Sequence, residues 1–65
     1  IPGDPVINLV NVNYIMSSYI GILFEFNLKC KRAGKKLTIV FSDEFLNKNK
    51  EMFSIFINEG IFVGQ

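Results

Sequence analysis

A glycine separates two contrasting patterns in the middle of this sequence. Across residues 19–33, apolar residues recur at intervals of three and four, the spacing of one helical face. Gly34 follows directly, where helices commonly end in a left-handed residue. Residues 36–41 (KLTIVF) are then almost wholly apolar, which is typical of a strand buried on both faces of a parallel sheet. The sequence therefore predicts a helix, a glycine end and a buried strand in succession.

Further elements are predicted on either side of this pair. The β-branched run in PVINLVNVN follows a proline-rich turn and predicts a strand at residues 7–12. Ser42 or Asp43 would cap a second helix that ends at Gly60, with residues 61–63 as a short last strand. The order strand, helix, strand, helix, short strand predicts an α/β fold, a small mixed or parallel sheet with helices on one face.

The second predicted helix carries two further signals. The polar stretch NKNK, residues 47–50, is a place where this helix could break. Beyond it, one face carries four apolar residues, Met52, Phe53, Phe56 and Ile57. We expect this stripe to belong to the core rather than to a docking groove.

The chain is short for its apolar content. It has 65 residues, enough for one small domain, and 49% of them are hydrophobic, more than so short a chain easily buries. It opens at Ile1 with the turn-like stretch IPGDP. We therefore expect residues 1–65 to be a single, partial domain. It would be an excised piece of a longer protein, and something else would cover its excess apolar surface.

Charge and cysteine content exclude several classes of partner and site. The chain has seven Lys and Arg and six Asp and Glu, which give a net charge of +1. This charge does not favour binding to nucleic acid or to anionic lipid. With no His and only Cys30, neither a disulfide framework nor a zinc or iron–sulfur site is expected. We expect Cys30 to be a small core residue, in keeping with a reducing, cytoplasmic setting. No apolar run is long enough for a membrane span.

The residues that could carry catalysis or bind phosphate are sparse. The acidic residues of the second half are scattered, and the neighbouring serines Ser17 and Ser18 have no His for a triad. We therefore expect no enzyme, no catalytic residue and no cofactor. The basic cluster at residues 29–36 suits a helix end, where cations complement the exposed carbonyls, better than a phosphate-binding patch.

Several phrases of the sequence together resemble the STAS domain, the fold of bacterial anti-sigma factor antagonists. In that family a strand leads into a phrase of the form hydrophobic, Asp, Ser, Ser or Thr, Gly, Leu, Gly, and the helix that follows closes with Lys, Arg and Gly. Here the phrase is YIMSSYIG and the closure is KRAGKK, followed by LTIV. The match covers residues 6–41 and extends loosely to Phe62 through EGIF. Relative to the family, the chain lacks the opening strands and the last helix. The resemblance therefore implies either a fragment of a larger STAS domain or a chain that completes its sheet with a second copy in a homodimer or with another protein.

The resemblance implies a regulatory protein of bacterial signal transduction and transcription regulation. In family members of the antagonist type, a kinase-like anti-sigma factor binds this phrase and phosphorylates its serine. The candidate phosphorylation site falls on Ser18, with Ser17 its neighbour, and the partner-binding residues would be Met16, Ser17, Ser18, Tyr19 and Gly21. A phosphate at a first helical turn is tolerated by the free N–H groups there, yet it adds charge that a partner must desolvate.

Two alternatives remain open at this phrase. Ser17 could simply cap the helix by accepting from the N–H of Tyr19 or Ile20, with Ser18 in the first turn and Gly21 allowing the helix to pack closely on the sheet. The chain could also be a structural or assembly module, attached to a transporter or a multi-domain sensor, without a phosphoswitch. Met16 stands where the family has Asp, and Tyr19 where it has Gly. In the assembly module these two side chains would form an apolar contact.

Overall fold

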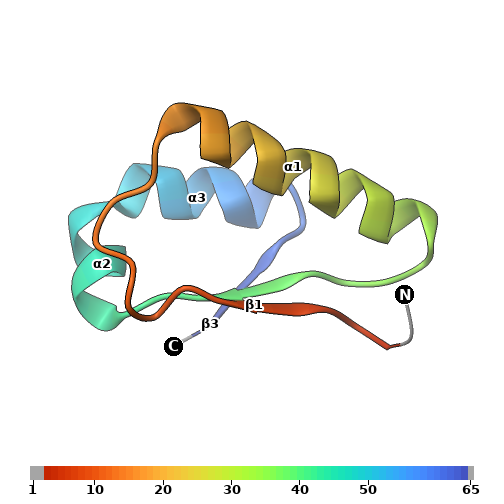
Figure 1. Cartoon of the computed structure of the whole chain (residues 1–65), viewed down its shortest axis with the longest axis horizontal. Coiled ribbons are helices and arrows are strands. Elements are labelled where there is room, and N and C mark those ends of the chain that lie inside the picture. The colour runs from red at the N-terminus through yellow and green to blue at the C-terminus, as the bar shows by residue number, and fades with distance from the viewer. Residues whose placement is uncertain (1–2, 65) are drawn as a thin grey trace.

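Three strands form a sheet that carries helices on one side. The computed structural model describes residues 3–64, and Figure 1 shows α1 and α3 side by side above the strands, with α2 at one end. The elements are β1 (Val6–Asn8), α1 (Ser17–Arg32), β2 (Thr38–Val40), α2 (Asp43–Lys48), α3 (Lys50–Asn58) and β3 (Phe62–Gly64).

The sheet is parallel throughout. The strand order is β1-β2-β3, and the register pairs Val6 with Thr38 and Thr38 with Phe62. Parallel neighbours need a crossover connection, which α1 supplies between β1 and β2 and the α2–α3 pair supplies between β2 and β3. The predicted α/β class is thus confirmed, with a small parallel sheet.

The two faces of the sheet differ in burial. Ile7, Ile39 and Val63 share a row and pack in the core or against it. The next row has the opposite orientation, because side chains alternate along a strand, and its outer members Val6 and Phe62 are exposed. The prediction that residues 36–41 are buried on both faces is therefore wrong. Only one face of the sheet is covered by elements within residues 3–64.

Glycines end both long helices, as predicted. The N–H of Gly34 donates to the carbonyl of Lys31 (3.0 Å) and that of Lys35 to Cys30 (2.8 Å). Gly60 repeats this arrangement at the end of α3, and both glycines have a positive φ, 72° and 80° respectively. This double hydrogen bond is the Schellman motif, which needs a left-handed residue after the helix.

The second crossover is divided into two helices. Ser42 caps α2 as predicted, its hydroxyl accepting from the N–H of Phe45 at 3.1 Å. The helix then breaks at Asn49, whose backbone leaves helical geometry at φ −128° and ψ 47°. The side-chain amide of Asn49 donates to the carbonyl of Phe45 (2.9 Å), and this bond stabilises the junction between α2 and α3. The break lies inside the NKNK stretch, where the sequence indicated one.

The first strand is shorter than predicted. It ends at Asn8, whereas the β-branched run suggested residues 7–12. The Asn8 side chain accepts from the N–H of Val10 (3.0 Å), and the N–H of Val12 donates to the carbonyl of Leu9. These local bonds turn the chain out of the sheet, because an Asn side chain competes with strand pairing for backbone donors.

Three of the nine buried core residues among residues 3–64 are phenylalanines, and their rings pack against one another. The ring of Phe41 stacks on Phe45 with centroids 4.8 Å apart and on Phe56 at 6.0 Å, while Phe24 meets Phe56 edge to face at 5.5 Å. Cys30 is fully buried here, as expected. Asn27 is the buried polar side chain among residues 3–64, and its amide donates to the carbonyl of Glu59 (2.9 Å). This bond ties the middle of α1 to the end of α3.

Candidate functional site

The predicted site, residues 16–21, lies at the start of α1, where the loop after β1 connects the sheet to the helix layer. Figure 1 shows the loop after β1 rising past α2 before α1 begins. Met16 is the N-cap residue of α1, and the helix starts at Ser17. Of the predicted partner-binding residues, Met16, Ser17, Ser18 and Tyr19 are consecutive and all exposed.

The helix start lacks a side-chain cap. Met16 has the extended backbone of an N-cap residue, but its side chain makes no capping hydrogen bond. The N–H groups of Tyr19 and Ile20 both donate to the carbonyl of Met16, at 3.0 and 3.1 Å. The expectation that Ser17 caps the helix is therefore wrong, because Ser17 already lies within the first turn.

Both serines are exposed. Within residues 3–64, neither Ser17 nor Ser18 forms a side-chain hydrogen bond, and their N–H groups find no acceptor there. The first turn of α1 also carries no acidic residue. The helix start thus combines two accessible hydroxyls with unsatisfied backbone donors.

The surface around the serines is apolar and uncharged. Tyr14 is 76% exposed, Met16 61% and Tyr19 39%, and Ile22 is exposed one helical turn further on. No charged residue occurs anywhere from position 5 to position 24. We call the exposed residues Tyr14, Met16, Ser17, Ser18, Tyr19, Gly21 and Ile22 the α1-start surface.

Gly21 belongs to this surface rather than to the helix–sheet contact. It is exposed, and a Cβ built on it would have no heavy atom within 4 Å. The expectation that Gly21 allows close packing on the sheet is therefore wrong. Its place among the predicted partner-binding residues is compatible with its exposure.

Sequence reasoning missed two members of the α1-start surface. Tyr14 lies in the loop before the helix, which has no periodicity to indicate burial or exposure. Ile22 is one of the apolar residues of 19–33 whose spacing predicts a helical face, yet it is exposed; its spacing of three from Tyr19 could have indicated that it continues an exposed stripe.

A hollow lies between α2 and the loop that leads to α1. Its volume is about 440 Å³, and it lies between Asn13 of the loop and the residues Ser42, Glu44, Phe45 and Lys48. Lys48 Nζ donates to Glu44 Oε1 across 2.9 Å on its rim. This hydrogen bond, aided by the charge of Lys48, lowers the pKa of Glu44. The hollow brings together a loop residue and α2 residues that are far apart in sequence, but none of its lining residues belongs to the α1-start surface.

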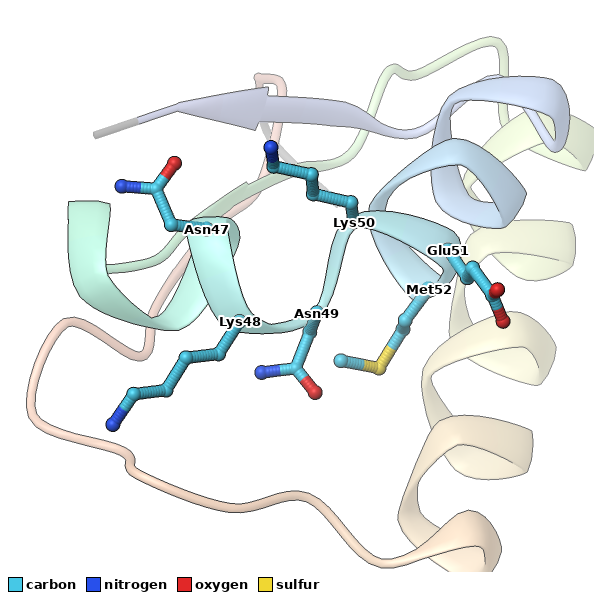
Figure 2. Close-up of a pocket in the computed structure, with 6 residues that line it drawn as sticks. All are labelled: Asn47, Lys48, Asn49, Lys50, Glu51 and Met52. Carbon is cyan, nitrogen blue, oxygen red and sulfur yellow. The ribbon is translucent and has the colours of Figure 1, made fainter.

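A second hollow lies at the junction of α2 and α3. It measures about 470 Å³ and is lined by one continuous segment, residues 47–52. Figure 2 shows its side chains diverging: Asn47 and Lys50 extend to one side of the junction, and Lys48, Asn49 and Met52 to the other. Because a ligand site needs polar groups that converge, this hollow is not the candidate site.

The described residues contain neither a metal-binding cluster nor a membrane-spanning helix. In residues 3–64, no three Cys, Asp or Glu side chains lie close enough together to hold a metal ion. The longest described helix, α1, is too short and too polar to cross a membrane, and so are the others described.

Comparisons with known proteins add no assignment. Protein-family models, curated proteins and solved structures were all searched, and none matches this chain.

Proposed function

We propose that this chain is a non-enzymatic regulatory module of the STAS type that docks on a kinase-like anti-sigma factor in the cytoplasm. The observation that carries the proposal is the α1-start surface, where exposed Met16 and Tyr19 flank two accessible serine hydroxyls. The parallel strand–helix–strand order supports it, since this succession underlies the resemblance to the family.

Docking would draw its energy from the apolar side chains. Burying exposed apolar area is worth about 25 cal/mol per Å², and large amphipathic residues such as Tyr dominate binding surfaces. Tyr14, Met16, Tyr19 and Ile22 are the large exposed side chains here. Because the surface carries no charge, a partner can cover it without desolvating an ion.

Phosphorylation of Ser18 would act as the switch. Ser18 is the second residue of α1, so a phosphate there meets the positive end of the helix dipole and the unsatisfied N–H groups of the first turn. The modification adds about −1.5 to −2 units of charge to a surface that has none. It would therefore oppose docking while leaving the helix intact.

Mass spectrometry tests the switch directly. The chain is incubated with its kinase-like partner and ATP, and phosphate is expected on Ser18 and lost in Ser18→Ala. Ser54→Ala is the matched control, because Ser54 is also an exposed helical serine but its hydroxyl donates to the carbonyl of Lys50. Phosphate on neither Ser17 nor Ser18 would exclude the switch.

Binding measurements test the docking surface separately. Met16→Ala combined with Tyr19→Ala should weaken partner binding by at least about tenfold, if each side chain contributes about 1 kcal/mol. Ile55→Ser, an exposed apolar change on α3, is the control. Unchanged affinity in the double variant would refute docking through this surface.

The second candidate is an assembly module without a switch, part of a transporter or multi-domain sensor. The exposure of Met16 and Tyr19 favours it, because such side chains suit a permanent apolar contact. Binding that is lost in the double variant, together with no phosphate on either serine, would select this candidate.

A further inference from the structure

We draw no further inference here: the strongest candidate, the face of the three-stranded sheet on which Val6 and Phe62 are exposed, carries none because nothing in the structure of residues 3–64 shows what covers it.

Discussion

Replacing Met16 with a capping residue should stabilise the fold. Met16 is the N-cap of α1 with φ −72° and ψ 150°, nearly the same backbone as Ser42, the N-cap of α2, at φ −71° and ψ 156°. Only Ser42 uses its side chain, accepting from the N–H three residues on. The N–H of Tyr19 already donates to the Met16 carbonyl, whereas the N–H of Ser18 has no acceptor within residues 3–64. Because an N-cap side chain accepts from the second or third residue of its helix, Met16→Ser or Met16→Asp can accept from the N–H of Ser18 without moving the backbone.

The gain can be estimated from the missing bond. A capping side chain is worth about 1 kcal/mol over a residue that cannot cap, and a carboxylate gains a further 0.3–1 kcal/mol, roughly, from the helix dipole. For a domain of this size, each kcal/mol raises the melting temperature by about 4–8 °C. We therefore expect increases of about 1 kcal/mol for Met16→Ser and somewhat more for Met16→Asp.

The pH dependence distinguishes the two variants. In Met16→Asp, the hydrogen bond and the dipole lower the pKa of the new carboxyl below its unfolded value of about 3.9. Its contribution is therefore present above that value and lost as the pH falls through the folded pKa. Met16→Ser should show no such loss.

Urea unfolding followed by circular dichroism measures both effects, with Met16→Ala and Ser42→Ala as controls. Met16→Ala should leave the stability nearly unchanged, because Met16 makes no capping bond, whereas Ser42→Ala should lose about 1 kcal/mol. A loss of stability in Met16→Ser, or no loss in Ser42→Ala, would refute the reasoning.

Other changes have expected outcomes from the same structure. Gly21→Ala should raise the free energy of unfolding by about 0.5–1 kcal/mol, because Ala favours an open helical position; Gly34→Ala should lower it by about 1–2 kcal/mol, because its φ is positive. Urea titrations compare the two, and equal effects would contradict the assignment of their backbones. Asn27→Ala should cost about 1–3 kcal/mol in the same assay by leaving a main-chain carbonyl without its donor, and a neutral result would show that this bond is dispensable. Lys48→Met should raise the pKa of Glu44 towards its ordinary value in an NMR titration, because the Lys48 hydrogen bond and charge keep that pKa low. Since the folded pKa is lowered, the contribution of the pair is present above 4.5 and is lost as the pH falls through the folded value.

Signals that depend on neighbouring residues were readable from the sequence. The left-handed ends at Gly34 and Gly60, the cap at Ser42 and the helix break at residues 47–50 all follow from local backbone chemistry. The end of β1 follows from local chemistry too, but there the Asn8 side chain prevailed over the β-branched run around it. Competing local preferences of similar strength could not be ranked without the structure.

Features that depend on distant residues could not be predicted. Asn27 is buried because its amide meets a carbonyl 32 residues away, which no helical spacing reveals. Ile22 is exposed and Leu23 is buried because α1 packs against the rest of the fold through the face that carries Leu23, and Ile22 lies outside that face. For the α1-start surface, the sequence located the serines but not Tyr14, whose exposure depends on the course of the loop beside α2.

The parallel arrangement of the sheet sets the order in which the chain can fold. Val6 meets Thr38 only after a 32-residue segment has closed, and β3 reaches β2 through another long crossover. No strand pair can therefore form as a local hairpin, and the entropy of loop closure is lost before any strand contact is gained. The helices can form early, but the three strands must assemble together around β2. Until then both sides of that strand lack neighbours, and the half-folded chain is open to pairing with other chains.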